Sequence, residues 1–424
     1  MVASTDIKFF VHSNNNAPQL QNAFGSMIGV LDACLVNGIS LRIVSTLTAV
    51  GTTVTAVFSA SHNLMQYQVI KIVGANQAEY NGEHRILTVP NATSVTFQVA
   101  SAPSVTTATG SITASLPPLG WEKPFSSTNE AGGGKAAYRS KNTLLPSRPY
   151  LRVVDELDPA YTATYAKFAK VGIVENMTGI DTLSGVQAPY DSANVDKNWV
   201  GSGSGSAVVN GWARWYYANA AEYGVATSTD ATAPASGNRS YLVVGSSDYF
   251  YILPVATPSG QYALTYGFGA FESFLAADNA CTFLSATLNN NTASSTSNKQ
   301  GYTGIAGNNS NQLVLLQRAY NQAASYATSQ SISLGVSNTI YSGTSDYIGS
   351  ASLMGLVPIS PVFINETVLR GELPGCCWVF QNKPYSNYAI FEKSGDLFIA
   401  PLIAASASGS GGYGQIALRI GRLL

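Results

Sequence analysis

The chain of 424 residues has very few charges. Asp, Glu, Lys and Arg make up 11% of it, whereas about 25% is typical of soluble domains. The 22 basic and 23 acidic residues nearly cancel, and no run of Lys or Arg is long enough to follow a phosphate backbone or an anionic membrane. We therefore expect no direct nucleic-acid ligand and no membrane partner. A polar surface with so few charges repels little, which favours association.

Long apolar runs and export signals are also absent. No stretch approaches the roughly 18 uninterrupted apolar residues of a membrane-spanning helix. The first residues, MVASTDIKFFVHS, lack the basic start and the apolar core of a secretory signal. We expect a chain that is made in the cytosol and stays soluble.

Residues with reactive or metal-binding side chains are scarce. The chain has only three histidines, His12, His62 and His84. Its four cysteines are Cys34, Cys281, Cys376 and Cys377. None of these residues has the spacing of a hydrolase motif, a zinc site or a disulfide framework. We predict ordinary surface or turn histidines, reduced cysteines, no cofactor, no metal site and no enzymatic activity. A glycosidase stays an alternative, because its two catalytic carboxylates come together only in the folded chain.

The densest acidic cluster consists of Asp155, Glu156 and Asp158, directly before Pro159. Its oxygen atoms are of the type that binds a hard cation. A solvated strand end would have the same composition, and we favour that interpretation.

One segment has the pattern of an amphipathic helix. Between residues 18 and 36, apolar side chains recur at the i, i+4, i+7 and i+8 spacing of one helical face, beginning at Leu20 and Phe24. Pro18 suits the first turn, and Asn37 with Gly38 suits the end. We expect segment 1–42 to hold this helix and to pack on the main domain; packing on a neighbouring subunit is the alternative.

The pattern then changes to a period of two. Residues 43–115 contain five or six short segments that are rich in Val, Ile, Thr and Phe and are separated by turn residues. This pattern predicts a small Ig-like sandwich or barrel with its own core, which includes Ile70, Ile72, Ile86 and Phe97. Residues 116–424 continue as a larger β-rich domain with Ser-, Asn- and Gly-rich loops, such as 201–206 and 289–300. The predicted fold class is mainly β.

An aromatic segment is the one candidate binding site. It consists of Trp212, Trp215, Tyr216 and Tyr217. Flat rings of this kind stack on sugars, but they also pack in cores and at interfaces. We favour packing, and keep glycan stacking as the alternative.

In order along the chain, these segments resemble a group of bacteriophage virion proteins encoded among tail genes. The segments are AFGSMIGVLDACLVNG, a β module ending in TGSITA, PLGWEKPFSSTNEA, GWARWYY, YLVVGSSDYFYI, YGFGAFESF and LRGELPGCCWVF. The match is poorest between residues 275 and 360. The resemblance implies a structural role in the virion and transfers no catalytic residue.

We therefore expect a structural subunit of a tailed bacteriophage, in the tail or baseplate, made in the host cytoplasm and assembled with copies of itself and other virion proteins. Scarce charge and adaptable loops suit such assembly. The alternatives are an adhesin of the same particle that binds glycans of the host surface, a decoration protein of the capsid or collar and, less favoured, a cell-wall glycosidase.

Overall fold

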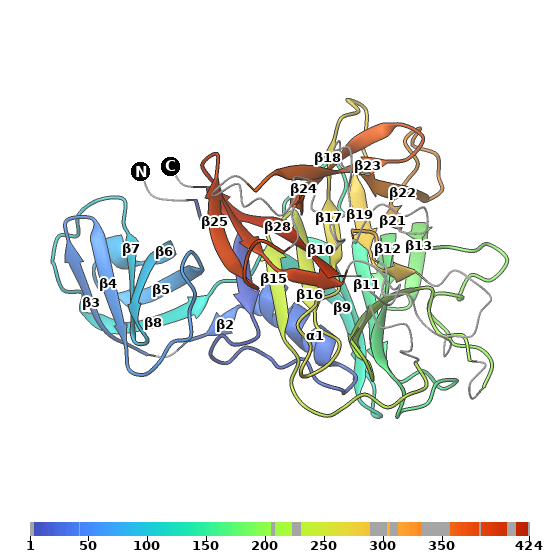
Figure 1. The fold of residues 1–424 in the computed structure, drawn as a ribbon, viewed down its shortest axis with the longest axis horizontal. Coiled ribbons are helices and arrows are strands. Elements are labelled where there is room, and N and C mark those ends of the chain that lie inside the picture. The colour runs from blue at the N-terminus through green and yellow to red at the C-terminus, as the bar shows by residue number, and fades with distance from the viewer. Residues whose placement is uncertain are drawn as a thin grey trace.

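The computed structural model describes residues 4–41, 43–204, 208–222, 230–288, 303–305, 313–332, 357–380, 383–404 and 413–422. These residues form three antiparallel sheets and one short α-helix (Figure 1). The structure confirms the mainly β fold class. The tract 289–300 and residues 205 and 206 of the tract 201–206 lie outside the described residues.

The helix is shorter than its pattern predicts. α1 (Ser26–Leu31) begins after Gly25, which has a φ of 87°, and continues as the π-helical turn η1 (Asp32–Asn37). A Cβ atom on Gly25 would lie 2.9 Å from the Cα atom of Gly133, so this close approach requires glycine. Leu20 pairs with Arg239 instead of joining the helix. The prediction of a helix from residue 18 is therefore wrong for its first half, because tertiary pairing holds that half extended.

A seven-stranded sheet occupies the module predicted at 43–115 and extends past it at both ends, to residues 39 and 40 and to Leu116. Its order is β2 (Ile39–Ser40), β8 (Gly110–Leu116), β5 (Val69–Ala75), β6 (Gly82–Asn91), β7 (Ser94–Gln98), β4 (Thr53–Phe58) and β3 (Val44–Val50). A bridge between Thr48 of the edge strand β3 and Thr107, just before β8, brings the two ends of this sheet together. The sheet therefore curls round on itself, as in a small barrel. All four predicted core residues are fully buried.

A second seven-stranded sheet begins the larger β-rich part. Its order is β20 (Thr287–Leu288), β14 (Ala213–Ala218), β12 (Lys167–Gly179), β11 (Tyr150–Glu156), β10 (Gly133–Ser140) and β9 (Trp121–Thr128), with β13 (Thr182–Ala188) paired to β12. α1 packs against β10 and β11. Every residue of the helix is at least partly covered by its own chain.

The third sheet has fourteen strands. Its main order is β1 (Lys8–Val11), β15 (Tyr241–Gly245), β16 (Tyr249–Pro254), β17 (Tyr266–Ala270), β19 (Thr282–Ser285), β21 (Leu313–Leu316), β22 (Ala327–Ile332), β23 (Ile359–Asn365), β24 (Leu369–Val379), β28 (Tyr413–Arg422), β26 (Asp396–Ala400) and β25 (Ala389–Lys393). In addition, β18 (Glu272–Ser273) pairs with β24, and β27 (Leu402–Ala404) pairs with β28.

Both faces of the fourteen-stranded sheet are buried along its first strands. Val243 and Phe250 pack into a core shared with the second seven-stranded sheet. Their neighbours Leu242 and Tyr251 point the other way, into a second core that also contains Trp378. This arrangement explains why β15 and β16 read as continuous apolar runs, because neither face meets solvent.

Candidate functional site

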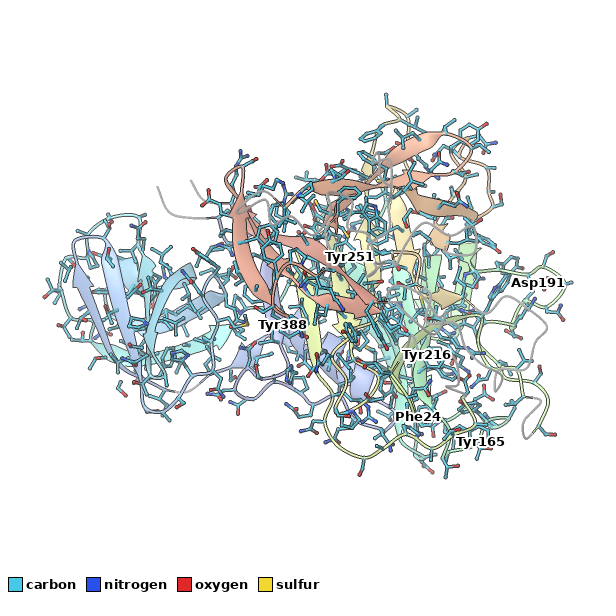
Figure 2. The ribbon with its side chains drawn as sticks, viewed as in Figure 1. Phe24, Tyr165, Asp191, Tyr216, Tyr251 and Tyr388 are labelled. Atoms are coloured by element: carbon cyan, nitrogen blue, oxygen red, sulfur yellow. The ribbon has the colours of Figure 1, made fainter. Side chains whose placement is uncertain are left out.

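The aromatic segment lies mostly inside the protein. Trp215, Tyr216 and Tyr217 are fully buried, and Trp215 stacks on Tyr266 with ring centroids 5.8 Å apart. Figure 2 shows Tyr216 within the body of the molecule. Only Trp212 is partly exposed. Trp215, Tyr216 and Tyr217 therefore pack in the core, out of reach of a sugar.

The acidic cluster is not a solvated strand end. Asp155 is fully buried at the start of α1, where the amides of Met27 and Ile28 donate to its Oδ2 atom at 3.0 and 3.3 Å. The Tyr217 hydroxyl donates to its Oδ1 atom at 2.6 Å. Burial raises the pKa of Asp155 to about 6, against the opposing effect of these hydrogen bonds. This side chain holds the helix on the sheet.

The other two acidic residues take part in ion pairs. Asp158 is buried and lies 2.8 Å from Lys170 Nζ, and Glu156 lies 3.9 Å from Lys135 Nζ. Among the described residues, no group of three or more His, Cys, Asp and Glu side chains is arranged to hold a metal ion. In that same part of the chain, no helix is long and apolar enough to cross a membrane.

Two histidines lie in the core of the module, not on its surface as the sequence suggested. His62 and His84 are buried, and burial lowers the pKa of both. The ring of His84 stacks on Phe97 at 4.3 Å, with its Nε2 atom 2.9 Å from the Tyr80 carbonyl oxygen. Both side chains are packed as structural residues.

All four cysteines are free and buried. Burial raises the pKa of each thiol; for Cys377 it reaches about 12. A thiol with a raised pKa is a poor nucleophile near neutral pH.

Four exposed apolar side chains lie on segments that are hydrogen-bonded together. We name this set the apolar patch: Phe274, Tyr320, Val368 and Leu369, which are 52%, 42%, 36% and 39% exposed. The amide of Phe274 donates to the Arg370 carbonyl oxygen, beside Leu369. The amide of Tyr320 donates to the Glu366 carboxylate, in the turn that contains Val368.

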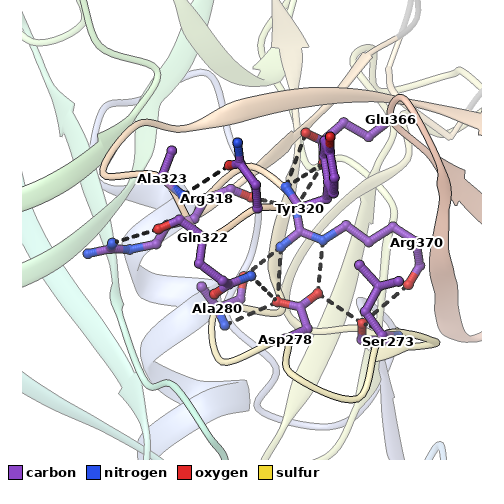
Figure 3. A network of polar contacts seen from close by, with 11 residues as sticks. Ser273, Asp278, Ala280, Arg318, Tyr320, Gln322, Ala323, Glu366 and Arg370 are labelled. Carbon is purple, nitrogen blue, oxygen red and sulfur yellow. Dashed lines mark hydrogen bonds and ion pairs between the residues drawn. The ribbon is translucent and has the colours of Figure 1, made fainter.

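A buried ion pair holds these segments in place (Figure 3). Arg370 has no exposed side-chain surface, and its Nε and Nη2 atoms contact the two carboxylate oxygens of Asp278 at 2.9 and 3.0 Å. Its Nη1 atom contacts Glu366 at 3.0 Å and donates to the Arg318 carbonyl oxygen at 2.5 Å. Burial opposes ionisation of Asp278, but Arg370 outweighs it and holds the pKa of Asp278 below its usual value.

This brace extends to the second seven-stranded sheet. Arg318 forms a two-pronged ion pair with Glu175 of β12, at 2.6 and 2.9 Å, and Gln317 donates to the same carboxylate at 3.0 Å. The loop that presents Tyr320 is therefore fixed to both large sheets.

A polar groove runs along the end of β28. It comprises two adjoining cavities of about 560 and 310 Å³, which share Glu272, Asp396 and Arg419 in their walls. Glu272 faces Glu372 directly across the pairing of β18 with β24. Burial, together with the charge and hydrogen bonding of Glu272, raises the pKa of Glu372.

Tyr249 and Arg419 lie on the wall of this groove and are hydrogen-bonded to each other, and Asp396 Oδ1 is buried on the same wall. The nearest cation to Asp396 is Arg422, whose Nε lies 3.9 Å away, beyond hydrogen-bond reach. Tyr249 is 7% exposed; burial raises its pKa to about 12, and the nearby charge of Arg419 acts in the opposite direction.

Sequence reasoning missed both the groove and the apolar patch. Asp278 and Arg370 are 92 residues apart, so no local spacing pairs them. One signal was present, because an Arg inside an apolar strand pattern of a charge-poor chain must find a buried partner. Nothing local identifies that partner.

The fold and these contacts define a mainly β protein of three antiparallel sheets with a braced apolar patch and a polar groove. No protein-family model matches the chain, and no curated protein matches it. Among solved structures it is similar to a chain titled "Phage phi92 endosialidase", with 9% sequence identity and a TM-score of 0.15. The alignment covers 91% of this chain and 52% of that chain, so this chain spans about half its length. Because the TM-score is this low, the likeness carries no argument about fold or function.

Proposed function

We propose that the chain is a structural subunit of a tailed bacteriophage particle, located in the tail or baseplate, that works by assembling with copies of itself and with other virion proteins. The observation that carries the proposal is the apolar patch. Its four large side chains face solvent in the isolated chain, although the segments that present them are firmly held. Exposed apolar patches on a folded surface commonly mark contact sites for other proteins.

The brace beneath the patch suits a role in assembly. Because Arg370 and Arg318 are fixed by ion pairs to Asp278 and Glu175, little conformational freedom is left to lose when a neighbour binds. A preorganised surface gives tighter association for the same area.

The scarcity of unpaired charges supports the same proposal. Several of the few charged side chains are neutralised inside the chain, among them the fully buried pairs Arg370 with Asp278 and Arg214 with Asp230. A contact surface with few charges costs little desolvation when it is covered. The ordered resemblance of the sequence to phage virion proteins supports the choice of a tailed phage as the particle.

The alternatives receive less support from the structure. Burial of Trp215, Tyr216 and Tyr217 removes the stacking platform that motivated an adhesin.

The test is incorporation into particles. A phage lacking the gene is complemented with the variant Phe274→Ser with Leu369→Ser, and purified particles are assayed for the chain. The matched control is Leu144→Ser, because Leu144 is 90% exposed on a different loop. We expect the patch variant to fold normally but to be depleted from particles, and the control to incorporate as wild type. Normal incorporation of the patch variant would contradict the role given to the patch.

A further inference from the structure

Two carboxyl groups lie directly opposite each other beside the apolar patch. Glu272 of β18 pairs in register with Glu372 of β24, and the two side chains are hydrogen-bonded to each other. An ionised carboxylate only accepts hydrogen bonds, so this bond requires that one of the two groups holds a proton. When both are ionised, like charges stand directly opposite on antiparallel strands, which destabilises the pairing. The two strands are therefore held together more firmly when the pair carries a proton.

The strand that carries Glu272 also leads into the apolar patch. β18 is only two residues long, and β24 is the strand with which it pairs. The next residue, Phe274, is 52% exposed and belongs to the patch, and its amide donates to the Arg370 carbonyl oxygen at 2.8 Å. A change in the pairing of β18 with β24 therefore reaches Phe274 directly.

The buried ion pair limits how far such a change spreads. Between Glu272 and Phe274, the Ser273 hydroxyl lies 2.8 Å from Asp278 Oδ2 and 3.2 Å from the Arg370 carbonyl oxygen (Figure 3). Because the ion pair of Arg370 with Asp278 does not involve Glu272, loss of the strand pairing opens the segment locally and leaves the sheet folded.

Other charged and titratable groups face the carboxyl pair from the neighbouring elements. They are Arg419 of β28, Cys377 of β24, Tyr249 and Tyr251 of β16, and Lys393 and Asp396 of the β25–β26 hairpin. Across the larger cavity, Glu272 shares the walls with Asp6, Lys8, Glu83, Asp248 and Arg422. Burial and the charge and hydrogen bond of Glu272 raise the pKa of Glu372 above its ordinary value of 4.5, and Arg419 opposes this effect.

The direction of this pKa change gives the sign of the pH dependence. Because the pKa of Glu372 is raised in the folded chain, the pair supports the pairing of β18 with β24 fully below about pH 4.5. This support is lost as the pH rises through the raised pKa. The two carboxyls titrate as a coupled pair, so the change belongs to both.

We propose that Glu272 and Glu372 form a pH-sensitive switch beside the apolar patch: in acid a shared proton closes β18 onto β24 and fixes Phe274, and towards neutral pH the two carboxylates loosen this segment. A contact made by the patch is then tighter in acid. This consequence rests on the proposed function, whereas the switch itself is a property of the isolated chain.

Hydrogen exchange of the full chain tests the switch. Exchange is followed by mass spectrometry in peptides that cover residues 271–276, at about pH 4 and about pH 8, and is corrected for the intrinsic exchange rate at each pH. The variant Glu272→Gln removes one carboxylate and keeps a side chain that donates a hydrogen bond to Glu372 at both pH values. The matched control is Glu392→Gln, because Glu392 is exposed on β25 and lies opposite Leu397, which has no charge.

We expect protection of this segment to fall about threefold more from acid to alkaline pH in wild type and in Glu392→Gln than in Glu272→Gln, as expected for one like-charge pair across two strands. Added salt should reduce the difference, because it screens the two carboxylates. The proposal is overturned if wild type and Glu272→Gln lose protection equally, or if Glu392→Gln behaves as Glu272→Gln does. The measurement needs no particle, so it and the incorporation test of the patch can fail separately.

Discussion

Replacing Arg370 with Met should destabilise the main part of the chain by about 3 kcal/mol. Removing one partner of a buried ion pair typically costs 3–5 kcal/mol, because the remaining charge is left buried and unpaired. Asp278 would keep hydrogen bonds from the Ser273 hydroxyl at 2.8 Å, the Gln322 side-chain amide at 3.0 Å and the Ala280 amide at 3.2 Å. These donors compensate part of its charge, so we expect the lower end of that range.

Tryptophan fluorescence during urea unfolding measures this loss. All five tryptophans lie outside residues 43–115, so their signal reports on the main part of the chain and not on the module. The control variant is Arg422→Met, since Arg422 is 68% exposed and its Nε lies 3.9 Å from Asp396. Exposed pairs contribute about 0 to 1 kcal/mol, so the control should unfold close to wild type.

A double variant separates the ion pair from other effects of the substitution. Arg370→Met together with Asp278→Leu removes both charges, and its cost should be well below the sum of the two single costs. If Arg370→Met costs less than about 1 kcal/mol, or if the single costs simply add, the buried pair is not the brace described above.

Three further predictions follow from the buried residues. Phe97→Ala should lower the stability of the module by about 3 to 5 kcal/mol, seen by circular dichroism, and leave the tryptophan transition unchanged. Asp155 has its pKa raised by burial from 3.8 to about 6, so its contribution to stability is full below pH 3.8 and is lost as the pH rises through 6; relative to Asp155→Asn, wild type should lose about 2 kcal/mol between pH 4 and pH 7. The four thiols should react with a thiol reagent at pH 8 only after unfolding; rapid reaction of Cys376 or Cys377 in the native chain would contradict their burial.

The sequence predicted those elements whose signal is local. Period-two segments became strands in the module, for example around Phe97. Continuous apolar runs became the strands β15 and β16, which are buried on both faces. The predicted helix was too long. Leu20 and Phe24 fit a helical face, but Leu20 pairs with Arg239 and Gly25 adopts a positive φ. The spacing of side chains cannot reveal such a tertiary contact.

The candidate sites could not be predicted, because they join residues that are far apart in the chain. Glu272 meets Glu372 across 100 positions, and the groove also contains the first and last strands. The aromatic segment attracted attention for the opposite reason. Its rings are close in sequence, but Trp215, Tyr216 and Tyr217 lie in β14 and are covered on both faces. The local density of aromatic residues therefore gave no information about exposure.

A reconstruction of the intact phage particle by electron cryomicroscopy tests the central proposal most directly. We expect several copies of this fold in the tail or baseplate, with Phe274, Tyr320, Val368 and Leu369 covered by a neighbouring chain. A particle whose tail and baseplate contain no density for the three sheets, or in which these four side chains face solvent in every copy, would contradict it.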